Sequence, residues 1–121
     1  MRSTVFGAVR AFLTPVSALA QEAGDAAAGE KAFAPCKACH NFQKNGVGPD
    51  LKGVVGRKAG TYEGYNFSAA LKNSGITWDE ANLHEWLKNP KAKVPGNKMI
   101  FQGIADDKKI NDVIAYLKTQ S

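Results

Sequence analysis

The segment Cys36-Lys37-Ala38-Cys39-His40 constrains this protein more than any other part of its sequence. Two cysteines three residues apart and a histidine directly after them are typical of a c-type haem attachment site. Each thiol can form a thioether with a vinyl group of the haem, and the adjoining imidazole is then held beneath the ring, where it can bind iron. The chain has only these two cysteines, so the motif uses both.

Other uses of a Cys-x-x-Cys pair fit the sequence less well. A tetrahedral zinc site needs two further ligands, and His84, the only histidine outside the motif, has no cysteine beside it. A thioredoxin-like pair begins a helix after a strand, whereas the residues before Cys36 have helical character. A disulfide across so short a loop contributes little stability. We therefore predict one haem c, attached covalently through Cys36 and Cys39.

The composition indicates one globular domain. The 121 residues are 22% charged and 44% hydrophobic. A chain of this size buries a limited core, so a haem would supply much of the apolar volume and the apoprotein should fold poorly. The formal net charge is +5, but no nucleic-acid-binding motif is present. We expect acidic protein partners rather than nucleic acid, and a monomer.

The first 20 residues differ from the rest of the chain. They contain no acidic residue and end in Ala18-Leu19-Ala20, which resembles a small-x-small signal-peptidase site. Arg10 and Pro15 interrupt the apolar run, which argues against a membrane-spanning helix. We predict a cleaved export signal over residues 1–20 and a monohaem domain over residues 21–121 in the periplasm. The alternatives are a disordered leader, a misassigned gene start, and a retained leader that tethers the protein to a membrane.

Hydrophobic periodicity and capping residues predict an all-α domain of about four to five helices. Asp25 can cap a helix that runs to about Ala34, and Pro35 should end it. A short helix is predicted over 68–73. A second helix begins at a capping box over 77–80 and ends near Asn89, and a last helix is capped by Asp106. Residues 41–65 and 91–104 are predicted to be loops, and those loops would wrap the haem.

The second axial position of the iron has several candidate ligands: methionine, histidine, lysine or none. Met99 is the only methionine beyond the leader and lies in a polar loop. A lone methionine can also fill a gap in a core, but a histidine–methionine pair is a recurring haem ligation, so we predict His40 and Met99. His84 is expected to be solvated.

This ligand pair predicts an electron carrier rather than an enzyme. Six-coordinate iron has no vacant site for a substrate, and a soft thioether favours ferrous iron. The same ligands serve both oxidation states, so electron transfer needs little rearrangement. If Met99 is not bound, the alternative is an enzyme or gas sensor with an open haem site, such as a peroxidase.

From about Gly24 to Leu117 the chain resembles a class I cytochrome c, most closely the bacterial cytochrome c2 group, which is similar to mitochondrial cytochrome c. The segments that carry the resemblance are Cys36-x-x-Cys39-His40, Gly48-Pro49-x-Leu51, Gly56-Arg57-Lys58, Gly75-Ile76-Thr77-Trp78, Asn89-Pro90-Lys91 and Pro95-Gly96-x-Lys98-Met99-Ile100-Phe101.

The resemblance implies roles for several residues. Pro49 would present its carbonyl to the free imidazole nitrogen of His40. Arg57 and Trp78 would hydrogen-bond a haem propionate. A tyrosine usual at that site is Phe67 here, so Tyr65 would compensate. Other departures from the usual residues fall near the methionine ligand, at Leu71, Trp86 and Asn97.

The resemblance also implies packing and partners. Gly29 would let the first and last helices approach closely. Lys31, Lys91 and Lys98 match part of a lysine ring around the exposed haem edge, which would steer acidic partners. The implied donor is a complex of the quinol–cytochrome c reductase type. The implied acceptor is a terminal oxidase, a reaction centre or a reductase.

Overall fold

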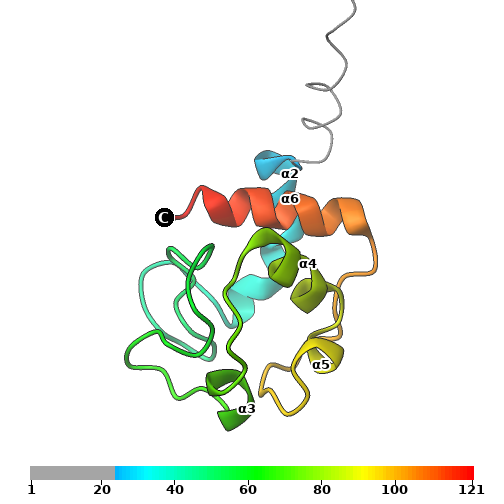
Figure 1. The fold of residues 1–121 in the computed structure, drawn as a ribbon. Helices are drawn as coiled ribbons and strands as arrows, with labels where there is room; N and C mark the ends of the chain where they lie inside the picture. Colours follow the sequence, from blue (N-terminus) through cyan, green and yellow to red (C-terminus); the bar gives the residue numbers. More distant parts are fainter. Residues whose placement is uncertain (1–23) are drawn as a thin grey trace, which may run out of the picture.

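The computed structural model describes residues 24–121, in which helices alternate with long loops (Figure 1). The helical elements are α2 (Ala26–Ala32), the 3₁₀ helix η1 (Ala34–Ala38), α3 (Ala69–Lys72), α4 (Glu80–Lys88), α5 (Pro90–Lys93) and α6 (Asp107–Lys118). Within this range the β-type pairing is an isolated bridge between Lys58 and Thr77. The predicted all-α class is confirmed, whereas the predicted export signal lies outside the described residues.

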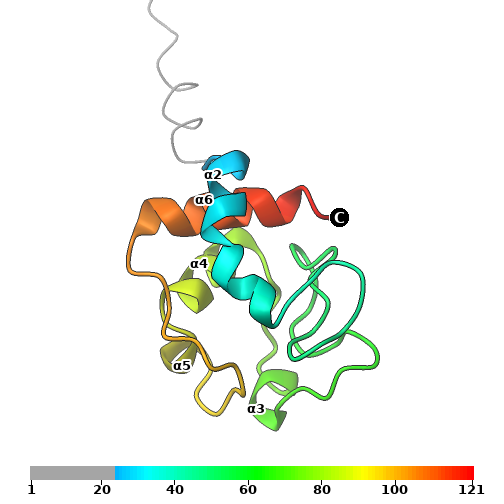
Figure 2. The same cartoon turned by 180° about the vertical axis from the view of Figure 1, so that it is seen from behind.

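Helices α2 and α6, from the two ends of the described chain, pack against each other (Figure 1 and Figure 2). Gly29 permits this contact, because a Cβ at that position would lie 1.8 Å from the carbonyl oxygen of Asp112 and 3.0 Å from the Cβ of Tyr116. Phe33 follows α2, is 2% exposed, and has its ring centroid 5.5 Å from that of Tyr116. The predicted close approach of the first and last helices is confirmed.

The apolar faces of α4 and α6 form the core beside this contact. Asp106 caps α6 as predicted, with its carboxylate accepting a hydrogen bond from the Lys108 backbone N–H. Each helix buries an apolar stripe at helical spacing: Leu83, Trp86 and Leu87 on α4, and Ile110, Val113, Ile114 and Leu117 on α6.

Several predicted boundaries are wrong. α2 ends at Ala32, and Pro35 lies in the first turn of η1, where its missing N–H costs no hydrogen bond. α4 is capped by Asp79, whose carboxylate accepts from the Asn82 N–H at 2.8 Å, so the predicted capping box at 77–80 does not form. Thr77 instead takes part in the bridge to Lys58.

The predicted loop over 91–104 is also partly wrong, because α5 occupies its beginning. Pro90 is at the start of this helix, a position that suits its fixed φ. The Asn89 side chain caps it by accepting a hydrogen bond from the Ala92 N–H at 3.2 Å. The one-turn helix directs the following chain toward the cavity described below.

The loop segment 41–68 lies on the side of the molecule opposite α5 in both views (Figure 1 and Figure 2). Side-chain hydrogen bonds take the place of regular structure there. Asn41 accepts from the N–H groups of Gln43 and Lys44, each at 2.8 Å. Asn45 accepts from the Asp50 N–H at 2.8 Å and donates to the Glu63 carbonyl at 3.2 Å. These bonds give the loop a defined shape.

Asp112 joins the start of α2 to α6. One carboxylate oxygen accepts from the Asp25 backbone N–H at 2.8 Å, and the other accepts from Lys108 Nζ at 2.9 Å. The Asp112 side chain is buried, and the Lys108 ammonium, followed by the Asp25 hydrogen bond, lowers its pKa against the opposing effect of burial. The charged carboxylate therefore stabilises the helix pair.

We predict that Asp112→Asn lowers stability at neutral pH, because the amide keeps an oxygen for Asp25 but loses the charge that pairs with Lys108. The native pKa of Asp112 is below its ordinary value of 3.8. The stabilisation that the charged Asp112 carboxylate provides is therefore fully present when the pH is above that ordinary pKa. It is lost as the pH falls through the lower, native pKa. Denaturant unfolding should show a deficit at pH 7 that shrinks in acid.

Lys109→Gln, on the same helix, is the matched control and should leave stability nearly unchanged. A deficit of Asp112→Asn that is the same at neutral and acidic pH would contradict the assigned role of the charge.

Candidate haem site

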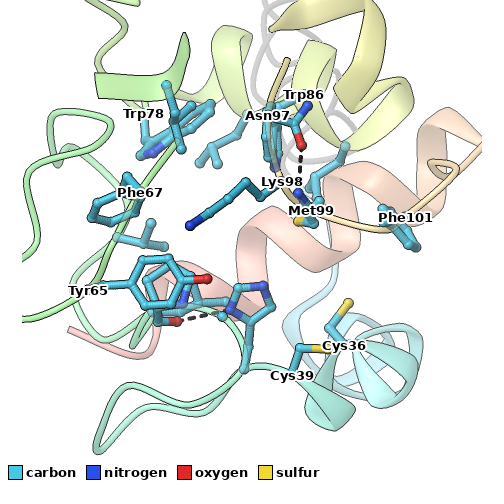
Figure 3. A pocket seen from close by; sticks show the side chains of 18 of the residues that line it. Cys36, Cys39, Tyr65, Phe67, Trp78, Trp86, Asn97, Lys98, Met99 and Phe101 are labelled. Carbon is cyan, nitrogen blue, oxygen red and sulfur yellow. Dashed lines mark hydrogen bonds between the residues drawn. The ribbon is translucent and has the colours of Figure 1, made fainter. Parts of the chain in front are cut away.

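All eight residues that the sequence analysis singled out for the site line one cavity between the helices and the 41–68 loop: Cys36, Cys39, His40, Pro49, Arg57, Tyr65, Trp78 and Met99. Figure 3 shows Cys36 and Cys39 on one side of this cavity and Trp78 and Trp86 on the other. The structure thus brings together side chains that are up to 63 positions apart, from Cys36 to Met99.

The turn of η1 places the two thiols and the imidazole together. The Cys36 carbonyl accepts from the N–H groups of both Cys39, at 3.1 Å, and His40, at 2.9 Å. The Cys36 side chain is half-buried, and burial, with a smaller effect of Cys39, raises its thiol pKa. Cys39 is exposed. The two cysteines do not form a disulfide with each other.

The His40 ring is held by the Pro49 carbonyl, which lies 2.9 Å from Nδ1. A carbonyl can only accept, so Nδ1 carries the proton and Nε2 keeps a lone pair that can bind a metal. Burial lowers the pKa of His40, and the bond to Pro49 partly opposes that shift. The ring is therefore neutral at physiological pH, the state in which imidazole binds iron.

Gly48 is required beside this ring. A Cβ at position 48 would lie 2.5 Å from His40 Cε1 and 2.8 Å from Nδ1. The Gly48-Pro49 pair is part of the family motif, and this contact is the steric reason for its glycine.

Met99 is half-buried at the cavity, and its loop is organised by Asn97. The Asn97 oxygen accepts from the Met99 backbone N–H at 2.8 Å. Its amide group donates to the carbonyls of Pro90 at 3.0 Å and Val94 at 2.9 Å. Sequence reasoning identified Asn97 only as an unusual residue and missed this role, although asparagine two positions before a fixed N–H is a recurrent turn signal.

The 41–68 loop carries Arg57 and Tyr65 to the cavity, and the segment between α3 and α4 carries Trp78. Arg57 Nη2 donates to the carbonyls of Asp50 at 3.0 Å and Lys52 at 2.7 Å. Trp78 is 7% exposed. The Tyr65 hydroxyl donates to the Val47 carbonyl at 2.7 Å, so its proton is already engaged.

The far wall of the cavity is apolar. Phe67 and Trp86 are each 8% exposed, and Leu71 packs at the edge of the core. The ring centroids of Trp78 and Trp86 are 5.2 Å apart, and those of Tyr65 and Phe67 are 4.9 Å apart. Leu71 and Trp86, two of the unusual residues near Met99, therefore present carbon surface to the cavity.

The rim of the cavity includes exposed apolar side chains. Val47 is 74% exposed and Ile100 is fully exposed, and both line the opening. The predicted docking residues Lys31, Lys91 and Lys98 are all exposed. Lys98 also lines the cavity, and its Nζ donates to the Asn66 carbonyl at 2.5 Å.

These residues fit a covalently bound haem. Two thiols, an imidazole with an available Nε2 and a thioether share one largely apolar cavity, and the cavity opens beside Cys39 and Ile100. A flat, mostly hydrophobic ring with polar substituents on one edge matches this lining.

Comparison with known proteins agrees with this geometry. The cytochrome c family model matches residues 26–121. Cytochrome c2 from Blastochloris viridis is 49% identical, with 98% of this chain and 93% of that protein covered. Cytochrome c-554 from Methylosinus trichosporium is 56% identical, with 78% and 74% covered. The solved structure of cytochrome cH from Methylobacterium extorquens has 73% identity and a TM-score of 0.79, with 79% of this chain and 99% of that chain covered.

The chain therefore belongs to the cytochrome c family, as a class I member similar to bacterial cytochromes c2. Its cofactor is one covalently bound c-type haem, and Cys36 and Cys39 have the spacing of the attachment motif. It is an electron carrier and not an enzyme, which removes the peroxidase alternative. Among residues 24–121 no helix is long and apolar enough to cross a membrane.

We predict that Asn97→Ala lowers the unfolding free energy of the haem-loaded protein by about 1–3 kcal/mol, because the Met99 N–H loses its acceptor and the carbonyls of Pro90 and Val94 each lose one of two donors. Thermal or denaturant unfolding measures this loss. Asn73→Ala is the matched control, since that exposed side chain forms no hydrogen bond with the described residues. Equal stability of the Asn97 variant and the wild type would refute the role of this side chain in the Met99 loop.

Proposed function

We propose that the protein is a soluble periplasmic one-electron carrier in which His40 and Met99 are the axial ligands of a haem tethered by Cys36 and Cys39. The observation that carries the proposal is the His40 imidazole, oriented by Pro49 so that Nε2 is available, in the same cavity as the Met99 thioether. When bound, the haem supplies the one-electron couple of its iron.

The surrounding residues suit this chemistry because they limit rearrangement. Pro49 and Gly48 hold the imidazole on one side. Asn97 fixes the backbone of Met99 on the other. The apolar wall of Phe67, Leu71 and Trp86 excludes water from the cavity. Two ligands held independently by the protein can remain in place in both oxidation states.

We propose further that Arg57 and Trp78 bind a haem propionate. Arg57 uses only Nη2 for its hydrogen bonds to the described residues, so its other N–H groups are available to a carboxylate. The buried Trp78 indole N–H is a second donor. Tyr65 can contribute only if its hydroxyl exchanges the Val47 carbonyl for a propionate oxygen.

The proposed docking face is the cavity rim with its flanking lysines. Exposed Val47 and Ile100 give an apolar contact, and Lys31, Lys91 and Lys98 give positive charge. The partners proposed on this basis are a donor of the quinol–cytochrome c reductase type and an acceptor that is a terminal oxidase, a reaction centre or a reductase.

The periplasmic location rests on the sequence of residues 1–20. Removal of that segment would leave Gln21 as the first residue. Mass spectrometry of the native protein tests the proposed cleavage, and a retained Met1 would contradict it.

We predict that Met99→Ala converts a low-spin haem into one that binds carbon monoxide. Wild-type protein should show a thioether-to-iron charge-transfer band and no response to carbon monoxide, because both axial positions are filled. The variant should lose the band and respond. His84→Ala should behave as wild type, because the His84 ring lies 3.4 Å from the Asp107 carboxylate and does not line the cavity. A carbon monoxide response in the wild type would overturn the proposed ligation.

We predict that neutralising the docking lysines slows electron transfer to an acidic partner. Lys91→Gln with Lys98→Gln should lower the bimolecular rate constant several-fold at low salt, and the difference should fade as ionic strength screens the charges. Stopped-flow kinetics across a salt series measures both effects. Lys109→Gln is the matched single-charge control, and a wild-type rate that does not change with salt would contradict electrostatic steering.

A further inference from the structure

Asp50 is a buried carboxylate that the proposed electron-transfer site does not use. Its residue is 3% exposed, and Asp50 and Asp112 are the buried charged residues of the described chain. Asp112 joins the start of α2 to α6, whereas Asp50 directly follows Pro49, whose carbonyl holds His40. A buried charge is costly unless it is well bonded.

Each oxygen of Asp50 has a donor. Oδ1 accepts from the Lys52 backbone N–H at 2.8 Å, and Oδ2 accepts from the Tyr62 hydroxyl at 3.1 Å. The Asp50 backbone N–H donates to the Asn45 side chain at 2.8 Å. Both donors to the carboxylate stabilise its negative charge.

Arg57 contacts both Asp50 and Tyr62. Its Nη2 donates to the Asp50 carbonyl, and its guanidinium carbon lies 4.4 Å from the centroid of the Tyr62 ring. Burial lowers the pKa of Arg57, and Tyr62 and Asp50 oppose that shift. Each member of this Asp50–Arg57–Tyr62 cluster therefore contacts the other two.

The cluster lies directly behind the haem cavity. Arg57 lines the cavity, and the Pro49–Asp50 peptide connects the cluster to His40. A negative charge in a region of low dielectric stabilises the more positive state of a nearby redox centre, which here is oxidised iron. The carboxylate is thus placed to act on the redox equilibrium and not only on the shape of the loop.

We propose that Asp50 and Tyr62 are positioning residues that hold Arg57 and the Pro49 carbonyl in place, and that the Asp50 carboxylate lowers the reduction potential of the haem. This inference rests on the proposed ligation by His40. It assigns a function to a buried acid and a tyrosine that the sequence analysis did not single out.

The test is the reduction potential of haem-loaded Asp50→Asn, measured by spectroelectrochemical titration. The isosteric amide removes the charge, its oxygen can accept from the Lys52 N–H and its NH2 group can donate to the Tyr62 hydroxyl oxygen, so the potential should rise. A purely structural role predicts the opposite sign, because a loosened loop admits water, and water favours ferric iron. A lower or unchanged potential would therefore overturn the proposal.

Asp106→Asn is the matched charge control. It also removes one acidic group, but at an exposed helix cap, so its potential should shift much less. An equal rise in both variants would mean that net charge, and not the buried position, sets the effect, and would refute the assignment.

Tyr62→Phe keeps the proposal testable if Asp50→Asn fails to bind haem. The ring remains for Arg57, but the carboxylate loses a donor and its charge is less compensated, so the potential should fall while the charge-transfer band persists. An unchanged potential would refute the role of Tyr62. Loss of the band in the wild type itself would instead refute the proposed ligation, which distinguishes the two failures.

Discussion

The hydrogen bond from His40 Nδ1–H to the Pro49 carbonyl joins the two parts of this structure. His40 lies two residues beyond the end of η1, and Pro49 belongs to the 41–68 loop. The bond sets the tautomer of the ring and keeps Nε2 available, and it also anchors the loop against the helical core. Gly48 is the steric condition for this contact, since any side chain there would occupy the volume of the imidazole.

The helices supply a frame and the loops supply the site. The backbone contact of α2 with α6 at Gly29 fixes the two ends of the domain, and the apolar faces of α4 and α6 complete one side of the core. The cavity between this frame and the loops is lined by core residues such as Trp78 and Leu83. The haem therefore supplies part of the hydrophobic core, so haem binding stabilises the folded domain.

Polar side chains replace regular secondary structure in the long loops. Asn41 and Asn45 shape the segment after the attachment motif, Asn97 shapes the segment before Met99, and Asp50 is bonded at both oxygens. Each of these groups pairs backbone atoms that a helix or sheet would otherwise pair. A loop held in this way can be rigid, and rigid ligands favour electron transfer without rearrangement.

The sequence alone was enough to predict the haem attachment motif, the helix caps at Asp25 and Asp106, and the apolar faces of α4 and α6. It also left Met99 as the single candidate thioether ligand. Each depends on residues within a few positions of one another or on a unique residue type. The tertiary structure decided the rest. Thr77 is drawn into a bridge with Lys58, so Asp79 becomes the cap, and Tyr62 meets Asp50 only because the 41–68 loop closes on itself. Such contacts depend on the path of the whole loop around its cavity, and no short-range pattern of residues encodes that path.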